Sequence, residues 1–264
     1  CISIVASSAI YTAIEMLEKN NILNNKSSLK LKLLTSFNAE EESEIKDELD
    51  KVTEQGFTTI KIKVGKDVNA DIKKINNIQT NLNGRATLRI DANRGYTKKD
   101  GCKFVQGLKP DFIELFEQPC DANDWDANAA VAKLSHIPIM LDEPICSIKD
   151  IEKASKLKGV GLCKLKLKRF LSITKLTEAI KHAHKLGLKI VLGDGLGTEI
   201  NCWMEARIAK NLIDNAGEYN GFLKIDPKAR ILSNPLKFTN GFLLISENWN
   251  LEIDRDKLEK YSIN

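Results

Sequence analysis

A charged residue closes one short apolar segment after another along this chain, at intervals of about 25 residues. Each segment is followed by a turn and then by apolar residues spaced as in a helix. The marker positions are Lys63, Asp91, Glu117, Asp142, Lys166 and Asp194, separated by 28, 26, 25, 24 and 28 residues. Strands that alternate with helices at this interval are typical of βαβ units. The pattern therefore predicts a parallel sheet with helices between its strands.

The number of these units predicts an α/β fold of the (β/α)8 TIM-barrel type over residues 29–227. Seven strands can be read within residues 29–35, 58–64, 86–91, 112–117, 138–142, 161–167 and 188–192, and an eighth near 222–225. A chain of 264 residues is long enough for one such barrel and a little more. Residues 1–28 and 228–264 depart from the pattern, and we expect them to be pieces of a second domain whose main part is absent from this chain.

Three of the markers are carboxylates that end consecutive expected strands: Asp91, Glu117 and Asp142. The carboxyl ends of barrel strands meet at one rim, so the three side chains can converge. Converging carboxylates repel one another unless a cation lies between them, and oxygen-only ligation favours magnesium. The alternative is that each residue caps the helix that follows it. Three carboxylates in phase favour the Mg2+ site.

Lysines alternate on two of the expected strands. Lys61 and Lys63 are two residues apart, and so are Lys164 and Lys166, so each pair falls on one face of its strand. Strands of a parallel barrel are buried on both sides, where unpartnered lysines are rare. The carboxylates supply those partners, and a lysine beside a second cation loses its proton more readily. The two pairs therefore suggest two acid/base groups flanking one substrate carbon.

Composition narrows the possible partners and location. The 40 basic and 36 acidic residues are interspersed, with a net charge of +4 and no arginine-rich stripe, so we expect no nucleic-acid binding. No stretch approaches the roughly 20 apolar residues of a membrane span, and the start lacks a signal-peptide pattern. Six scattered cysteines resemble reduced, mostly buried thiols. We expect a cytoplasmic protein that acts on a small molecule, with homo-oligomerisation possible.

Five motifs in order carry a resemblance to a known family. They are Lys61-x-Lys63, Arg89-Ile90-Asp91-Ala92-Asn93, Glu117-Gln118-Pro119, Leu141-Asp142-Glu143-Pro144 and the lysines of residues 164–168. Together, across about residues 57–200, they resemble the enolase superfamily and, within it, the muconate lactonizing enzyme subgroup. The resemblance identifies residues 1–28 as the C-terminal helix of an α+β capping domain, and residues 228–264 as the segment that returns to it.

The resemblance also implies roles for individual residues. Asp91, Glu117 and Asp142 would bind Mg2+, which holds the carboxylate of a small substrate. Lys63 would be one acid/base catalyst, adjusted by Lys61. The second catalyst would be Lys166, with Lys164 as the alternative. The remaining candidates, supporting the ligands or contacting the substrate, are Asn93, Glu143, Asp194, Glu218 and Asn220.

The activity implied is abstraction of the proton α to a carboxylate through an enolate. Racemisation or epimerisation of a dipeptide or an N-acyl amino acid is the leading expectation. Dipeptide epimerases of this group carry an Asp-x-Asp that grips the substrate amine, and its equivalent here, Glu218-Tyr219-Asn220, is only half acidic. Two alternatives remain open. One is β-elimination or cycloisomerisation, as in o-succinylbenzoate synthase or muconate cycloisomerase, and the other is a barrel that binds metal without catalysis.

Overall fold

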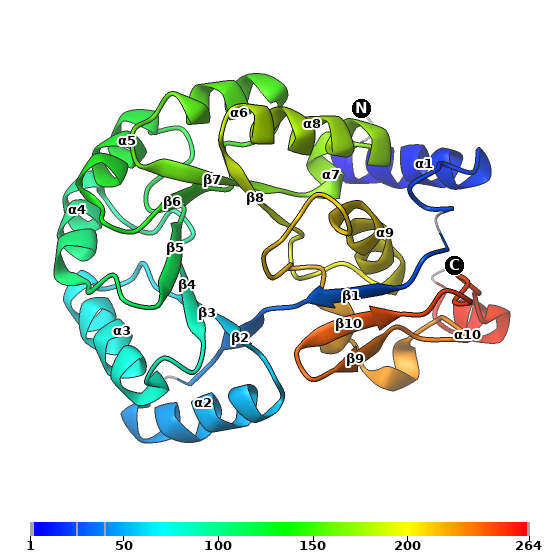
Figure 1. Cartoon of the computed structure of the whole chain (residues 1–264), viewed down its shortest axis with the longest axis horizontal. Helices are drawn as coiled ribbons and strands as arrows, with labels where there is room; N and C mark the ends of the chain where they lie inside the picture. Colours follow the sequence, from blue (N-terminus) through cyan, green and yellow to red (C-terminus); the bar gives the residue numbers. More distant parts are fainter. Residues whose placement is uncertain (1–2, 25, 40, 263–264) are drawn as a thin grey trace. The chain divides into compact units, whose positions relative to one another are not determined.

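The computed structural model describes residues 3–24, 26–39 and 41–262, which form two compact units (Figure 1). Unit 1 comprises Cys1–Leu33, Lys166–Glu178 and Val191–Asn264. Unit 2 comprises Leu34–Leu165 and Ala179–Ile190. The strand that ends at Leu165 therefore leads directly from unit 2 into unit 1.

A seven-stranded sheet follows the chain in sequence order and confirms the α/β class. Its strands are β2 (Thr35–Phe37), β3 (Thr59–Lys63), β4 (Thr87–Asp91), β5 (Ile113–Glu117), β6 (Ile139–Leu141), β7 (Val160–Leu165) and β8 (Lys189–Leu192). Every neighbouring pair from β2 to β7 is parallel. Parallel neighbours need a crossover connection, which the intervening helices supply.

Helices alternate with these strands as the sequence pattern predicts. They are α2 (Ile45–Glu54), α3 (Val68–Leu82), α4 (Lys98–Gly107), α5 (Trp125–Leu134), α6 (Ile148–Ser155) and α8 (Ile173–Lys185), with a short 3-10 turn, η1 (Glu42–Glu44), before α2. Helices α3 to α6 lie along the outer side of strands β3 to β7 (Figure 1). Ile75, Phe104, Val131 and Ile151, one from each of these four helices, are fully buried. Apolar burial along this interface is the main driving force for the layer.

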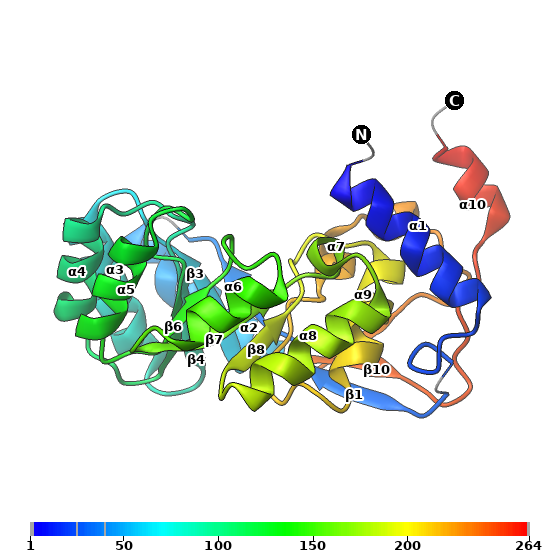
Figure 2. The ribbon, with the colours of Figure 1, turned by 90° about the horizontal axis from the view of Figure 1, so that it is seen from above.

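Unit 1 combines helices with a small antiparallel sheet. The sheet has the order β1 (Leu29–Lys32), β10 (Phe242–Ile245), β9 (Lys237–Thr239). Helix α1 (Ile4–Leu17) packs beside the short α7 (Leu167–Phe170), as Figure 2 shows. The unit also holds α9 (Glu199–Ala209), α10 (Arg255–Lys260) and the 3-10 turns η2 (Gly221–Lys224) and η3 (Pro227–Ala229).

Two expected strands differ from the structure. Residues 29–35 form two strands, of which β1 pairs antiparallel with β10 and β2 pairs parallel with β3. Leu33 and Leu34 between them are both buried, and two consecutive buried residues break the alternation of a single strand. The eighth strand expected near 222–225 is instead the 3-10 turn η2, in which the Leu223 N–H donates to the Asn220 carbonyl at 3.0 Å. That local bond replaces a ladder bond to a neighbouring strand.

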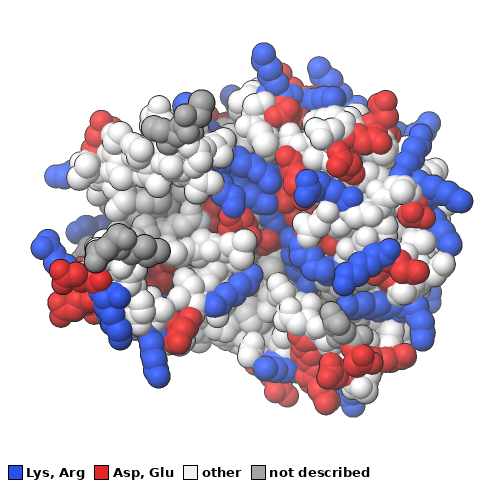
Figure 3. Space-filling view, turned by 180° about the vertical axis from the view of Figure 1, so that it is seen from behind, with Lys and Arg blue, Asp and Glu red and all other residues white. Residues whose placement is uncertain are grey.

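The surface is consistent with the charge pattern of the sequence. Basic and acidic side chains lie intermixed on the face drawn in Figure 3. None of the described helices is long and apolar enough to cross a membrane. Cys120, Cys163 and Cys202 are buried, and burial raises the pKa of each thiol to about 12. Cys146 is exposed, because it lies in the turn before α6, and it departs from the expectation of buried thiols.

Gly159, before β7, has a matched control in Gly187, before β8. Both have positive φ, +91° and +80°, but a Cβ at Gly159 would lie 2.0 Å from the Ala132 carbonyl oxygen, whereas one at Gly187 would meet nothing within 4 Å. We predict that Gly187→Ala lowers the free energy of unfolding by about 1–2 kcal/mol through left-handed backbone strain alone. Gly159→Ala should cost a further 1–3 kcal/mol, roughly, from overpacking.

Urea denaturation followed by circular dichroism measures both variants. If both variants lose the same free energy of unfolding, the close contact between Gly159 and α5 does not contribute to stability.

Candidate active site

Carboxylates and lysines alternate at the carboxyl ends of β3, β4, β5 and β7. Register pairs Lys63 with Asp91, and Asp91 with Glu117, across neighbouring parallel strands. Asp91 is fully buried, Glu117 and Lys164 are each 1% exposed, and Lys61 is 6% exposed. Charged side chains are rarely buried to this extent unless they are paired. Unit 2 therefore holds a built cluster of charges at one end of its sheet.

The contacts within this cluster form one row. The Lys61 Nζ lies 2.9 Å from Asp91 Oδ2 and 2.7 Å from Glu117 Oε2, so it bridges the two carboxylates. Lys63 Nζ lies 2.5 Å from Asp91 Oδ2, and Lys164 Nζ lies 3.3 Å from Glu117 Oε1. We call Lys63, Asp91, Lys61, Glu117 and Lys164, in this order, the alternating row. Because Lys61 and Lys63 reach the same carboxylate, they share the face that strand alternation predicts.

The row determines the ionisation of its central acid. Burial by itself would raise the pKa of Asp91, but attraction to Lys61 and Lys63 outweighs burial and holds that pKa below its usual value. Asp91 is therefore an anion at neutral pH. Lys63 differs from the other members because 56% of its side chain is exposed, so its ammonium group can meet a molecule that arrives from solvent.

Asp142 joins this end of the sheet through a residue that sequence reasoning did not select. It follows β6 directly, is 2% exposed, and donates its backbone N–H to Gln118 Oε1 at 2.9 Å. The Gln118 Nε2 donates to the Cys120 carbonyl at 2.9 Å, and its side chain is fully buried. Gln118 thus ties the end of β5 to the start of the loop after β6. The sequence feature that could have identified Gln118 is its position directly after Glu117, where an amide side chain stands at the end of an expected strand.

The loop after β4 places two further candidates. The Asn93 backbone N–H donates to Asp91 Oδ1 at 2.8 Å, and its side-chain carbonyl accepts from Lys63 Nζ. Arg94, the next residue, pairs its Nε with Glu143 Oε1 at 3.3 Å. Asn93 therefore supports both ends of the Lys63–Asp91 pair, while Glu143 contacts the same loop from its position after Asp142.

The other candidates lie in unit 1. Lys166 follows the end of β7 and is the N-cap residue of α7, and Lys168 lies within that helix. Lys168 Nζ is 2.7 Å from Asp194 Oδ2, in the loop after β8. Burial tends to raise the pKa of Asp194, but hydrogen bonds from Lys168 and from a backbone N–H, with attraction to Lys168 and Lys166, bring it below its usual value. Asp194 is therefore ionised and engaged with basic residues of the segment after β7.

Glu218 and Asn220 flank the same loop. Glu218 donates its backbone N–H to the Leu192 carbonyl at 2.8 Å and accepts from the Gly195 N–H at 2.7 Å. Both side chains are buried, at 4% and 3% exposure. The backbone bonds keep the Glu218 segment against the end of β8. The structure thus gathers Lys166, Asp194, Glu218 and Asn220 in unit 1, and the alternating row, Asn93, Asp142 and Glu143 in unit 2.

The donor chemistry of unit 2 suits a hard divalent cation. Asp91, Glu117 and Asp142 offer only oxygen ligands, are almost wholly buried, and lie at or directly after the ends of consecutive strands. In the described part of the chain, no three His, Cys, Asp or Glu side chains are grouped closely enough to hold a metal ion as they stand. The Lys61 ammonium group instead lies on Asp91 and Glu117 together. These residues fit Mg2+ in ligand type and charge, and binding it would require Lys61 to leave at least one carboxylate.

Comparison with curated proteins finds relatives that act on dipeptides and acylated amino acids. An L-Ala-D/L-Glu epimerase from Clostridium acetobutylicum is 30% identical over 189 residues, which cover 70% of this chain and 49% of that protein. An N-succinyl-L-Arg/Lys racemase from Bacillus cereus is 25% identical over 222 residues, 80% of this chain and 57% of that protein. This chain therefore spans about half the length of the curated relatives it matches.

Solved structures share the fold, and a family model shows the family. A muconate lactonizing enzyme from Klebsiella pneumoniae superposes with a TM-score of 0.78 at 22% identity, over 89% of this chain and 66% of that one. A dipeptide epimerase from Cytophaga hutchinsonii, complexed with Mg and the dipeptide D-Ala-L-Val, gives a TM-score of 0.75 at 22% identity, over 84% and 61%. The model of the enolase C-terminal domain-like family matches residues 44–257. The resemblance that the five motifs carry is thus confirmed, and this chain belongs to the enolase C-terminal domain-like family.

Proposed function

We propose that this chain carries the catalytic site of an Mg2+-dependent racemase or epimerase. It would remove the proton α to a substrate carboxylate, through an enolate, and return a proton to the opposite face. The alternating row carries this proposal, because it holds Lys63 at one end and Lys164 at the other, on two adjacent carboxylates. A reaction that exchanges a proton between two faces of one carbon needs a proton-transfer group on each side.

Asp91, Glu117 and Asp142 would hold the metal ion. When bound, Mg2+ would anchor the substrate carboxylate and stabilise the negative charge that develops as the α-proton leaves. Lys61, which is buried between Asp91 and Glu117, would leave at least one of them when the metal binds and would act from nearby as a positioning residue. Asn93 would hold the Lys63 side chain in place through its amide oxygen.

Lys63 Nζ would move the proton on one face of the substrate. It combines exposure to solvent with a fixed position beside Asp91. For the other face, sequence reasoning places Lys166 first and Lys164 second, and the contacts support the opposite order. Lys164 contacts Glu117 and lies on β7 itself, whereas Lys166 follows the strand and belongs to unit 1. We therefore propose Lys164 as the second acid/base catalyst, and its test includes both lysines.

A dipeptide or an N-acyl amino acid is the proposed substrate class. The names of the two curated relatives support it, since one is an epimerase of L-Ala-D/L-Glu and the other a racemase of N-succinyl-L-Arg/Lys. Glu218, with Asn220 two residues later, is the proposed contact for the free amine of a dipeptide. An N-acyl substrate has no such cation, so a dependence on Glu218 would separate the two classes.

The proposal extends to the flanking segments. Residues 1–28 and 228–264 are proposed to belong to a capping domain. The observation in favour is that α1, β9 and β10 lie in unit 1, apart from the parallel strands β2 to β7.

Asp142→Asn tests the metal site. The change keeps the shape of the side chain and removes its charge, so we expect Mg2+ affinity to fall by at least about tenfold. Isothermal titration calorimetry with MgCl2 on the full-length protein gives the affinity directly. Asp194→Asn is the matched control, because Asp194 is a partly buried, lysine-paired carboxylate outside the proposed ligand set, and it should leave the affinity unchanged. Equal weakening by both changes, or by neither, contradicts the assignment.

Exchange of the α-proton in D2O tests the reaction and the two lysines. Proton NMR follows L-Ala-L-Glu and N-succinyl-L-lysine with MgCl2 and full-length protein, starting from each epimer. Lys63→Met and Lys164→Met should each slow interconversion by at least about a hundredfold, since each removes one proton-transfer group. Each variant should still exchange the α-proton of the epimer that the remaining lysine faces.

The matched variant Lys166→Met should retain most of the interconversion rate. If it abolishes interconversion and Lys164→Met does not, Lys166 is the catalyst. Exchange at full rate in Lys63→Met, in Lys164→Met and in Lys166→Met contradicts the two-lysine proposal. A new product without epimer exchange would assign the site to elimination or cycloisomerisation.

A further inference from the structure

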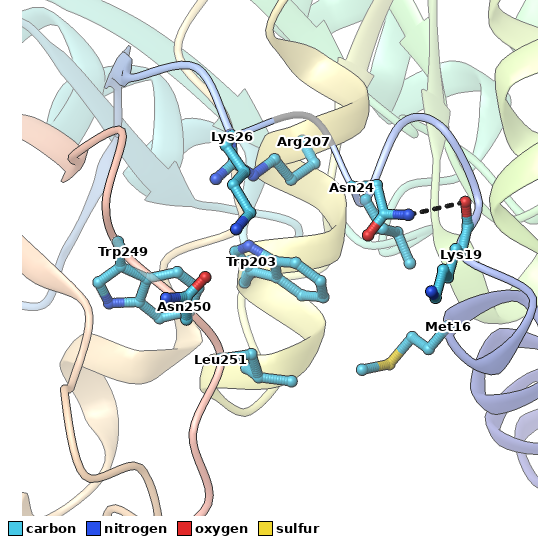
Figure 4. Close-up of a pocket in the computed structure, with 10 residues that line it drawn as sticks. Met16, Lys19, Asn24, Lys26, Trp203, Arg207, Trp249, Asn250 and Leu251 are labelled. Carbon is cyan, nitrogen blue, oxygen red and sulfur yellow. Dashed lines mark hydrogen bonds between the residues drawn. The ribbon is translucent and has the colours of Figure 1, made fainter.

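A pocket of about 210 Å³ in unit 1 lies outside the proposed reaction. It is bounded by the end of α1 with the turn after it, by α9 and by residues 249–251 (Figure 4). Its lining is largely apolar, with two exposed lysines, and none of the residues assigned to the proposed reaction is among the ten that line it. Unit 2, by contrast, holds a carboxylate with three donors beside the loop that follows Lys63.

One oxygen of this carboxylate, on α3, accepts from two loops at once. Asp71 Oδ2 accepts from the backbone N–H groups of Gly65 at 2.9 Å and Lys66 at 3.2 Å, in the loop after β3. The same oxygen accepts from the Tyr96 hydroxyl at 2.7 Å, in the loop after β4. Gly65 comes two residues after Lys63, which ends β3. Asp71 therefore joins the loop that follows the proposed catalyst to the loop after β4.

The two loops also touch along their backbones. Gly65 has a φ of +109°, and a Cβ there would lie 2.6 Å from the Ala92 carbonyl oxygen. Gly95 approaches Gly65 equally closely, since a Cβ at Gly95 would overlap the Gly65 backbone. Ala92 lies between the two residues that contact Lys63 Nζ. A displacement of either loop would therefore change the surroundings of Lys63.

Tyr96 gives this link a fixed end. It is 5% exposed, its ring centroid lies 5.1 Å from that of Phe104, and its backbone N–H donates to the Pro119 carbonyl at 3.1 Å. Burial and the Asp71 carboxylate raise the pKa of Tyr96, so its hydroxyl stays protonated and donates at neutral pH. Through Tyr96, Asp71 is thus connected to α4 and to the segment after β5.

Lys63 depends on such support because its side chain is the most exposed of the alternating row. Its ammonium group contacts Asp91 Oδ2 at 2.5 Å and the Asn93 side-chain oxygen. The Val64 N–H donates to the Asp91 carbonyl at 3.0 Å, which continues the pairing of β3 with β4 by one residue. The bonds to Asp71 begin at the next residue, so they hold the backbone from which the Lys63 side chain extends.

We propose that Asp71 is a positioning residue for Lys63. It acts through the loops after β3 and β4 and contacts neither the substrate nor the metal ion. The inference rests on the proposed function, in which Lys63 moves the proton on one face of the substrate. Loss of the Asp71 contacts should therefore impair proton transfer on that face and spare transfer by Lys164 on the other.

Exchange of the α-proton in D2O, with MgCl2 and full-length protein, tests this one-sided effect. The probe is L-Ala-L-Glu or N-succinyl-L-lysine, started from each epimer, and the epimer that Lys63→Met fails to exchange identifies the Lys63 face. For that epimer, Asp71→Ala should slow exchange by about tenfold or more, and Tyr96→Phe by less. For the other epimer, both variants should keep the rate within about twofold of wild type. Asp71→Asn retains an oxygen acceptor and should recover part of the lost rate.

Asp67→Ala is the matched control. Asp67 caps the same helix and accepts from the Asn69 and Ala70 N–H groups, both at 2.9 Å, so its loss also weakens the start of α3. These two bonds stay within the helix and reach neither loop. Asp67→Ala should therefore lower the urea midpoint of unfolding, as Asp71→Ala does, without slowing exchange of either epimer selectively.

NMR without Mg2+ or substrate tests the link apart from the reaction. In Asp71→Ala, the amides of Gly65 and Lys66 should lose hydrogen-exchange protection by about tenfold or more, because they lose their acceptor. The 13Cε signal of Lys63, assigned with Lys63→Met, should move toward that of exposed lysines. Asp67→Ala should leave both readouts at their wild-type values.

The outcomes distinguish this inference from the proposed function. If Asp71→Ala slows both epimers equally, or Asp67→Ala gives the same one-sided loss, Asp71 acts on stability alone and the inference is wrong. If the wild type exchanges neither epimer, the proposed function fails, and the Lys63 signal decides whether Asp71 positions that side chain. An unchanged Lys63 signal contradicts the inference in either case. If Asp71→Ala does not fold, Asp71→Asn and Tyr96→Phe provide the same comparison.

Discussion

The charges at the end of the parallel sheet depend on one interaction, the contact of Lys61 with two carboxylates at once. Asp91 and Glu117 are adjacent in register, and two buried anions this close would repel strongly without a cation between them. Lys61 Nζ supplies that cation from the neighbouring strand. Lys63 contacts the same Asp91 oxygen as Lys61, and Lys164 contacts the second oxygen of Glu117. Removing one partner of a buried pair leaves an uncompensated charge, which typically costs 3–5 kcal/mol, roughly. The alternating row is therefore stable only as a set.

This compensation bears on how such a site could serve the proposed reaction. Asp91 and Glu117 are almost wholly buried and already paired with cations, so a metal ion bound there would replace one cation with another. The displaced Lys61 ammonium group would stay tethered to β3, so it would remain near the carboxylates that it now bridges. Gln118 and Asn93 would hold the strand ends in place during such an exchange, because Gln118 accepts from the Asp142 backbone N–H and the Asn93 backbone N–H donates to the Asp91 carboxylate.

Sequence periodicity predicted the strands from β3 to β8, because helices alternate with them and a charged residue stands at the end of each strand or within two residues after it. The prediction failed at two places: where the backbone passes from one sheet to the other, and where it forms a 3-10 turn instead of a strand. In residues 29–35, the adjacent buried pair Leu33 and Leu34 marks the point at which one strand leaves the antiparallel sheet and the next enters the parallel one. Near Phe222, a local 3-10 bond competes with strand pairing, and a short apolar run cannot show which of the two prevails. Gln118 was missed because its role depends on a neighbouring strand.

Lys164, Lys166 and Lys168 show where the rule that alternate residues of a strand share one face stops applying. Residues two apart share a face only while the backbone stays extended, and β7 ends at Leu165. Lys164 therefore obeys the strand rule and reaches Glu117, whereas Lys168 lies within helix α7 and pairs with Asp194. Lys166, between them, is the N-cap residue at which the extended strand ends and helix α7 begins. Spacing alone cannot rank Lys164 against Lys166, because the ranking depends on where the strand stops, and the spacing of the lysines does not show that point.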